Sequence, residues 1–327
     1  MLKTRLCELL GLDVPIILAP MGTCTSAELA AAVSNEGGLG GIGSLFRPAA
    51  TVKRDIDVVK TLTNRPFAIN HIPQTLDTEA FRYTLEARPR VISFTLGDPG
   101  DLVGQAHAVG ARVMLQITTV AQAVLAAERG VDVIIAQGGE SGGYCGEVST
   151  MALVPQVVDA VSPIPVVASG GIFDGRGIAA ALMLGAVGVN LGTRFIASKE
   201  APGTEEWKQA IIHASSEDSV KVEVLNDISP VPGAVGFGTV LRSMRTPFLD
   251  EWSGKREEAP RPRPPEERNP GDAPGRSAAR DTTHCRADRR RNQGNPAGGR
   301  DHGQGNYALD IPAAVNLEKC RQAGEQG

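Results

Sequence analysis

Short apolar runs recur along the first 250 residues and are separated by Ala-rich amphipathic stretches and Gly-containing turns. The eight runs span residues 15–20, 40–43, 66–70, 91–95, 113–117, 133–137, 165–169 and 188–192. Each run is continuously apolar, which is typical of strands buried on both faces of a parallel sheet. The stretches at 26–37, 119–130 and 175–186 have helical periodicity and contain glycines suited to ending a helix.

Eight strands, each followed by a helix, predict an α/β fold of the (β/α)₈ TIM barrel type, which commonly uses roughly 200–250 residues as one domain. The alternative is an open doubly wound sheet, but no GxGxxG motif follows the first run. Residues 201–252 follow the eighth run and contain one amphipathic segment, a Gly/Pro-rich stretch and a final apolar segment. We expect a last helix and a partial cap over the barrel mouth, so that residues 1–254 form one capped domain.

The composition changes abruptly at residue 255. Residues 255–327 contain 14 basic and 11 acidic residues, whereas the rest of the chain contains 19 and 26. Large apolar residues are almost absent before Tyr307, so this low-complexity tail cannot bury enough surface to offset its ordering entropy. We predict that it is disordered. A nucleic-acid-binding arm is disfavoured by the mixed charges, and out-of-frame translation of a GC-rich gene is a further explanation of the Arg, Pro, Gly and Ala content.

The overall composition is that of an ordinary globular protein, with 42% hydrophobic and 21% charged residues. A net charge of −4 gives no reason to expect a nucleic-acid or membrane partner. Charges interrupt the N-terminal segment, which therefore does not read as a signal peptide, and no stretch approaches the ~20 apolar residues of a membrane span. The five cysteines lack CxxC spacing, so neither a metal site nor a disulfide framework is expected. We expect a cytoplasmic protein.

Two Gly-containing loops predict a phosphate site. Ser169, Gly170 and Gly171 follow the seventh run, and Gly192 and Thr193 follow the eighth. The corresponding loops of such barrels commonly bind phosphate, with a helix N-terminus behind them. Glycine lets backbone N–H groups approach the oxygens, and Thr193 adds a hydroxyl donor. The alternative is that these glycines only make tight turns, but two such loops in succession favour a ligand that carries phosphate.

Other loops at the predicted mouth suit a flat, polar ligand. The loop after the first run is small (Ala19, Pro20, Met21, Gly22), and the amides Asn70 and Gln116 lie at or near the ends of the third and fifth runs. These amides can hydrogen-bond the edge of a flavin ring, or each can cap its own loop. The loop at 137–146 is rich in glycine, and such a backbone can lie beside a planar ligand.

Five motifs, APMG, AINH, QGGESGGYCG, ASGGIFDGRG and NLGTRF, resemble those of the nitronate monooxygenase family, formerly called 2-nitropropane dioxygenases. The resemblance covers about residues 1–250. It implies a TIM barrel with non-covalent FMN and oxidation of alkyl nitronates by O₂. By position it implies cofactor contacts from loop one (Ala19, Pro20, Met21, Gly22), the flavin and ribityl region (Asn70, Gln116), loop six (Glu140, Ser141, Gly142) and the phosphate loops (Ser169, Gly170, Gly171, Gly192, Thr193).

Loop six departs from the family pattern. Many relatives have Gly-Gly-His there, with the histidine as catalytic base, and this chain has Tyr144. A phenol with a pKa of about 10 is a poor base at neutral pH, although it can donate a hydrogen bond to a nitro or carbonyl oxygen. His71, which follows Asn70, is a candidate replacement base, unless it is a loop histidine bonded to neighbouring backbone. Cys145 has no visible activator and is interpreted as a bystander.

The leading hypothesis is FMN-dependent oxidation of a nitronate or nitroalkane by O₂. A nitronate is already a carbanion equivalent, so the change to Tyr144 matters less for nitronates than for neutral nitroalkanes. The second hypothesis is an NAD(P)H-dependent reductase of a quinone or an enoyl thioester on the same scaffold. The third is a flavin-binding barrel without catalytic activity.

Overall fold

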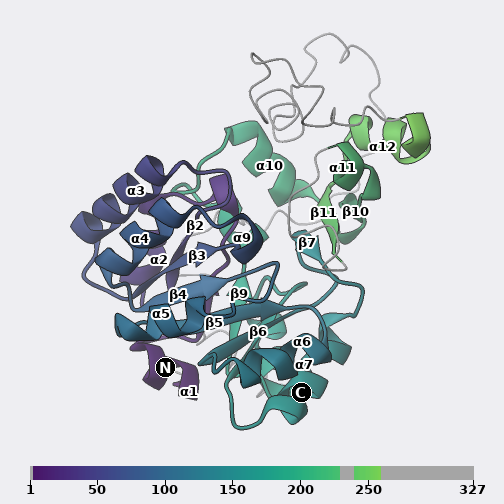
Figure 1. Ribbon diagram of the computed structural model, residues 1–327. Coiled ribbons are helices and arrows are strands. Elements are labelled where there is room, and N and C mark those ends of the chain that lie inside the picture. The colour runs from purple at the N-terminus through teal and green to yellow at the C-terminus, as the bar shows by residue number, and fades with distance from the viewer. Residues whose placement is uncertain (1–2, 229–238, 259–327) are drawn as a thin grey trace.

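Eight parallel strands form a barrel in the computed structural model, which describes residues 3–228 and 239–258 (Figure 1). The strands follow the order β1-β9-β8-β6-β5-β4-β3-β2, and a bridge between Ile17 and Leu39 joins the two ends of the sheet. The strands are β1 Ile16–Leu18, β2 Gly40–Gly43, β3 Phe67–His71, β4 Val91–Phe94, β5 Arg112–Ile117, β6 Val133–Gln137, β8 Val166–Ser169 and β9 Gly188–Leu191. The predicted barrel is confirmed, and the strand ends agree with the predicted runs to within two residues.

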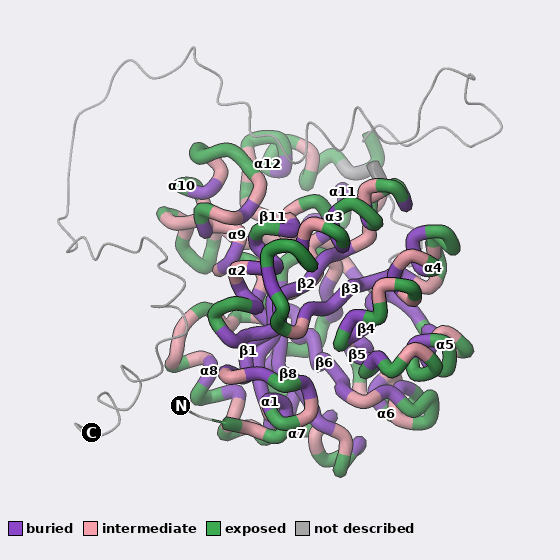
Figure 2. Tube along the Cα trace, turned by 90° about the vertical axis from the view of Figure 1, so that its left-hand side faces the viewer, coloured by how far each residue is buried: buried purple, intermediate pink, exposed green. Residues whose placement is uncertain are grey.

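The helices surround the strands, so that the buried chain lies inside and the exposed chain outside (Figure 2). Those of the barrel are α2 Ala27–Asn35, α3 Ala49–Leu62, α4 Thr78–Ala87, α5 Leu102–Ala108, α6 Val120–Glu128, α7 Thr150–Val161, α8 Gly175–Met183 and the short α9 Thr193–Ile196. Short 3₁₀ turns occupy Gly22–Cys24 and Pro73–Thr75. The side chains of Ser26, Asp77 and Thr119 accept hydrogen bonds from backbone N–H groups at the starts of α2, α4 and α6.

The barrel interior is apolar toward the amino-terminal ends of the strands. Helix α1, Arg5–Leu10, places Leu6 and Leu10 against side chains from several strands, including Ile17, Met114 and Val167. All of these side chains are buried. This packing closes the amino-terminal end of the barrel, and the carboxyl ends of the strands remain as the place for a site.

A cap lies at the other end. Strands β10 Ser219–Lys221 and β11 Val240–Met244 pair in antiparallel fashion, and β11 also pairs with β7 Gly143–Cys145 from the loop after β6 (Figure 1). Helices α10 Glu205–His213, α11 Glu223–Ile228 and α12 Pro247–Ser253 complete this region. The sequence predicted a helix and a partial cap here but not the three-stranded sheet.

The predicted tail falls almost entirely outside the described residues. Only 255–258 are described, and a 3₁₀ turn spans Arg256–Glu258. The predicted disorder of the rest stays a prediction. None of the helices described is both long and apolar enough to cross a membrane.

Candidate active site at the barrel mouth

Polar side chains replace the apolar ones toward the carboxyl ends of the strands. An internal cavity is lined by Ala68, Met114 and Ile135 together with Asn70 and Asn190. Side chains alternate along a strand, so Gln116 and Gln137, two positions after Met114 and Ile135, also point into the barrel interior. The inward-facing set at this end is therefore made of amides and hydroxyls: Asn70, Ser93, Gln116, Gln137, Ser169 and Asn190.

Two of these amides have an oxygen without a partner. The side-chain Nδ2 of Asn190 donates to Ser169 Oγ at 3.1 Å, and Ser169 Oγ donates to the Asn190 carbonyl oxygen at 3.1 Å. Asn190 Oδ1 and Gln137 Oε1 are buried and accept no hydrogen bond from any residue that the structure describes. Leaving a buried acceptor unsatisfied costs about 1–3 kcal/mol, so this pair favours a ligand that donates hydrogen bonds.

The predicted amides of β3 and β5 both face the mouth. Asn70 is buried, and its Nδ2 donates to Ser93 Oγ at 3.2 Å. Thr95 Oγ1 donates to Asn70 Oδ1 at 3.4 Å. These contacts with β4 and with the residue that follows it fix the Asn70 side chain, whereas Gln116, near the end of β5, is only partly buried.

The loops after β8 and β9, which we call loops seven and eight, offer free backbone donors. Gly170 and Gly171 have φ values of 114° and 69°, in the region that favours glycine. Among the hydrogen bonds of the described residues, none uses the N–H of Gly170, Gly171 or Gly192 as donor. The N-terminus of α8 is occupied, because Asp174 accepts from the backbone N–H of Arg176 at 3.0 Å. The free donors are therefore those of the loop backbone rather than those at the end of α8.

Loop six is linked to the loop after β8 through Thr150, the first residue of α7. Glu140 Oε2 accepts from both N–H and Oγ1 of Thr150 at 2.8 Å, and Thr150 Oγ1 lies 3.0 Å from the Gly170 carbonyl oxygen. Ser141 Oγ donates to the Gly138 carbonyl oxygen at 2.8 Å. Glu140 and Ser141 thus hold the loop in place.

Glycines allow loops six, eight and one to approach one another. A Cβ added to Gly142 would lie 3.5 Å from Thr193 Oγ1, and one added to Gly192 would lie 3.1 Å from Met21 Sδ and 3.6 Å from Ala19 Cβ. Pro20 lines the internal cavity. The predicted loop-one residues therefore lie beside the predicted phosphate loops.

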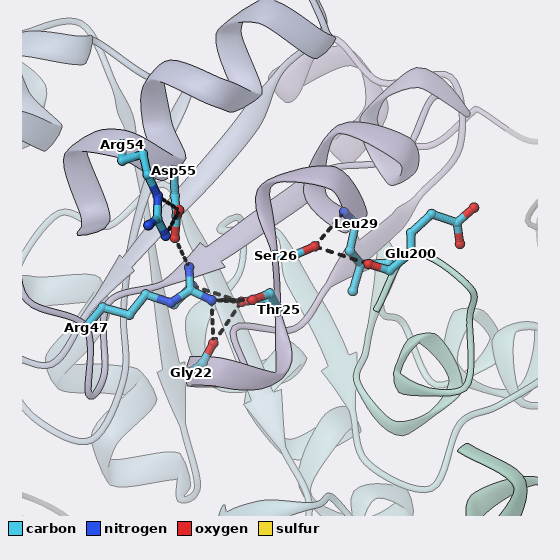
Figure 3. Close-up of polar contacts among 9 residues, drawn as sticks. Gly22, Thr25, Ser26, Leu29, Arg47, Arg54, Asp55 and Glu200 are labelled. Atoms are coloured by element: carbon cyan, nitrogen blue, oxygen red, sulfur yellow. Dashed lines mark hydrogen bonds and ion pairs between the residues drawn. The ribbon is translucent and has the colours of Figure 1, made fainter. Parts of the chain in front are cut away.

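Arg47, in the loop after β2, fixes loop one from the outside (Figure 3). Its Nη2 donates to the carbonyl oxygens of Gly22, at 2.9 Å, and Thr25, and its Nη1 pairs with Asp55 at 2.9 Å. Burial lowers the pKa of the guanidinium, and Asp55 opposes this shift. Arg47 was not among the predicted site residues, because its role depends on contacts with loop one and α3.

We expect Arg47→Met to lower the free energy of unfolding by about 3 kcal/mol, because it leaves the nearly buried Asp55 carboxylate without its main partner. Arg54 also pairs with Asp55, at 3.0 Å, but its side chain is 68% exposed. The matched control Arg54→Met should cost less than about 1 kcal/mol. Urea denaturation of the three proteins measures both effects. Equal losses in the two variants would contradict the role given to Arg47.

Tyr144 reaches across the mouth. It lies on β7 opposite Leu241 of β11, and its ring packs against Ile72 and Leu96 from the loops after β3 and β4. Two cap side chains hold the loop that carries it. Arg242 Nε donates to the Gly139 carbonyl oxygen at 3.0 Å, and Lys221 Nζ donates to that of Gly146 at 2.6 Å. The cap thereby positions Tyr144 over the barrel.

Cys145, next to Tyr144, is fully buried in this sheet. Its thiol lies 3.5 Å from the carbonyl oxygens of Gly139 and Val240. Burial raises its pKa, with Lys221 and Arg242 opposing the shift. Burial and the raised pKa disfavour the thiolate, which is the nucleophilic form, in agreement with the interpretation of Cys145 as a bystander.

His71 points away from the mouth. It is the last residue of β3, 1% exposed, and its Nε2 lies 2.9 Å from Thr84 Oγ1 on α4. Its ring meets Phe81 of α4 edge-on. Because Asn70 faces the barrel interior, its neighbour His71 faces the helices. Both sequence-based roles, replacement base and loop histidine bonded to backbone, disagree with this placement, so we do not include His71 among the proposed catalytic residues.

His71 should make stability depend on pH. Burial lowers its pKa from 6.5 to about 4, with Asp77 opposing the shift. The unfolded chain therefore takes up the proton first as the pH falls. The stability that depends on a neutral His71 is complete above about pH 6.5 and is lost toward pH 4. The loss amounts to about 3 kcal/mol. Urea denaturation between pH 7 and pH 4.5 should show this slope in the parent protein and a smaller one in His71→Gln. Identical slopes would contradict the prediction.

A family model described as nitronate monooxygenase matches residues 3–84 and 74–231. The chain belongs to the nitronate monooxygenase family. As a member it is a flavin-dependent oxidoreductase.

Individual relatives of this family member differ in their names. A probable nitronate monooxygenase of Staphylococcus haemolyticus is 33% identical over 272 residues, which are 68% of this chain and 76% of the relative. A Mycobacterium tuberculosis (3aS,4S,5R,7aS)-5-hydroxy-7a-methyl-1-oxo-octahydro-1H-indene-4-carboxyl-CoA dehydrogenase is 34% identical over 258 residues, which are 74% and 73% of the two chains. The structure of FabK from Thermotoga maritima superposes with a TM-score of 0.71 at 34% identity, covering 79% of this chain and 82% of FabK.

The residues of this nitronate monooxygenase family member fit a flavin. Within the described part of the chain, two buried amide oxygens accept no hydrogen bond and the glycine N–H groups of loops seven and eight donate none, and glycines let loops one, six and eight approach one another. Sequence reasoning missed Gln137 and Asn190 as site residues. Their signal was a single polar residue within an otherwise apolar run, at or near its carboxyl end.

Proposed function

We propose that the protein binds FMN and oxidises alkyl nitronates with O₂. The observation that carries this proposal is the chemistry of the mouth. Among the described residues, the side chains that face it from the strand ends are amides and hydroxyls, and a phenol, Tyr144, stands over them. These groups hydrogen-bond a substrate but remove no proton from carbon near neutral pH. The favoured substrate is therefore one that arrives as an anion.

Each loop then has a role toward the cofactor. The N–H groups of Gly170, Gly171, Gly192 and Thr193 bind the phosphate. The free oxygens of Gln137 and Asn190 accept hydrogen bonds from ribityl hydroxyls, with Ser169 orienting Asn190. Asn70 and Gln116 would hydrogen-bond the flavin, and loop one (Ala19, Pro20, Met21, Gly22) and loop six would hold its ring, with Glu140 and Ser141 shaping the loop-six backbone and Gly142 allowing close approach.

Tyr144 replaces the histidine that many relatives have. We propose that its hydroxyl donates a hydrogen bond to a nitro oxygen and so orients the nitronate carbon toward the cofactor. The chemistry that FMN supplies when bound is acceptance of electrons from the substrate and their transfer to O₂. The chain itself binds and orients the reactants in a pocket that the cap covers.

A second candidate is an NAD(P)H-dependent reductase of an enoyl thioester or quinone. The observation that favours it is the similarity to a carboxyl-CoA dehydrogenase and to FabK, both at 34% identity. Hydrogen bonds from the same mouth groups can orient a carbonyl oxygen as readily as a nitro oxygen.

Stopped-flow mixing of the yellow holoenzyme without O₂ separates the two candidates. Propyl nitronate, NADH and NADPH are each mixed with the protein, and flavin absorbance is followed. We expect rapid bleaching by propyl nitronate and slow bleaching by the nicotinamides. Rapid bleaching by NADH or NADPH together with none by the nitronate would replace the proposed function with the reductase.

A further inference from the structure

Loop one is anchored by the loop that follows β2. At its strand end, the Ala19 N–H donates to the Leu191 carbonyl oxygen at 2.8 Å. At its other end, the Arg47 guanidinium binds three oxygens: the carbonyl oxygen of Gly22 at 2.9 Å, that of Thr25, and Thr25 Oγ1 at 3.3 Å (Figure 3). The Arg47 side chain is only 7% exposed, so little water competes for these contacts.

The end of β2 lies against the same part of loop one. A Cβ added to Gly43, the last residue of β2, would lie 2.8 Å from the backbone nitrogen of Gly22 and 3.6 Å from that of Met21. The Gly43 N–H also donates to Thr25 Oγ1 at 3.4 Å. Loop one therefore rests directly on β2, with no space for a side chain between them.

A strained turn brings Arg47 to loop one. The Arg47 N–H donates to the Ser44 carbonyl oxygen at 3.0 Å, and Phe46, within this turn, has φ 61°, which is costly for a bulky residue. The Ser44 N–H donates to the Asn70 carbonyl oxygen at 3.0 Å. Because β2 lies between β1 and β3 in the barrel, its loop joins loop one to Asn70, the parts of the mouth assigned above to the flavin ring.

We propose that Arg47 is a positioning residue for the flavin, which holds loop one in the shape that the cofactor ring requires. A guanidinium offers a planar fork of donors in fixed geometry, and Nη1 of this fork is committed to Asp55 at 2.9 Å. None of the contacts that Arg47 makes with described residues reaches loops seven and eight, so its effect belongs to the ring and not to the phosphate. The inference rests on the proposed function for placing the flavin ring at loop one.

The test is a titration of the apoprotein with FMN and with riboflavin, which lacks the phosphate, followed by flavin fluorescence. Arg47→Lys should raise both Kd values by the same factor, about tenfold, because lysine keeps the charge beside Asp55 but loses the fork. Gly43→Ala should also raise both equally, since its Cβ displaces the Gly22 nitrogen while the ion pair stays intact. At saturating FMN, both variants should change the visible circular dichroism of the bound flavin, which reports the asymmetry around the ring.

Two controls separate positioning from a general loss of stability. Ser34→Ala removes a buried hydroxyl that donates to the Pro66 carbonyl oxygen at 2.8 Å and accepts from the N–H of Gly40, the first residue of β2, at 3.1 Å. It should lower the Tm and leave both Kd values unchanged to within about twofold. Gly104→Ala, the matched control for Gly43→Ala, places its Cβ in open space on α5 and should change neither Kd.

An Arg47→Lys or Gly43→Ala protein with both Kd values within about twofold of the parent and unchanged circular dichroism would overturn the proposal. A loss for FMN that riboflavin does not share would place the defect at the phosphate and overturn it as well. Failure of the proposed function looks different. A parent protein that binds neither flavin overturns both, whereas a flavin that NADH bleaches and nitronates do not would remove the nitronate chemistry and keep the role of Arg47.

Discussion

Alkyl nitronates should be oxidised with a kcat/KM on the order of 10²–10⁴ times that of the parent nitroalkanes at pH 7. The reason is that a nitroalkane must first lose a proton from carbon, and the phenol of Tyr144, in the place where the family resemblance implies a catalytic histidine, is a poor base at this pH. A nitronate arrives already deprotonated. Oxygen uptake with freshly neutralised propyl nitronate and with 1-nitropropane measures the ratio.

Variants of Tyr144 test the cause of this ratio. Tyr144→His should lower the nitronate-to-nitroalkane ratio of kcat/KM by raising nitroalkane turnover. Tyr144→Phe should leave this ratio high, because neither phenol nor phenyl is an effective base. His71→Gln should not change it, since His71 contacts α4 rather than the mouth. Equal rates for the two substrates in the parent protein, or a collapse of nitroalkane turnover in His71→Gln, would contradict the assignment of Tyr144.

Gly192→Asp should weaken FMN binding about a thousandfold. The added carboxylate would stand beside the proposed phosphate position, and two like charges about 4 Å apart repel by about 4 kcal/mol at a protein surface. Gly192 has φ −111°, so a side chain there brings no backbone strain of its own. The Cβ would meet Met21 Sδ at 3.1 Å, the end of a flexible side chain. Titration of the apoprotein with FMN, followed by flavin fluorescence, gives the Kd.

Gly192→Asn is the matched control, because it adds nearly the same volume without the charge. Its Kd should rise only about tenfold, from the crowding against Met21. If Asp and Asn weaken binding equally, the loss is steric and the phosphate does not lie beside Gly192. If neither variant affects binding, loop eight is not part of the cofactor site.

The sequence by itself determined the barrel. Strands buried on both faces must be continuously apolar, and helices that cover them must be amphipathic, so eight runs such as 133–137 and 188–192 could be recognised without any tertiary information. The paired glycine loops were also visible, because the positive φ angles of Gly170 and Gly171 favour glycine and Gly192 follows them in a recognisable order. These features depend on residues that are close together in the sequence, so they can be recognised from the sequence alone.

Only the tertiary structure decided which way the polar side chains point. A strand that is apolar on both faces carries no alternation, so the sequence does not show that Asn70 faces the mouth while His71 faces α4. The same ambiguity hid Gln137 and Asn190. The cap sheet was hidden for a different reason: β7 is three residues long and finds its partner β11 far along the chain, and pairing between distant short strands leaves no periodic pattern.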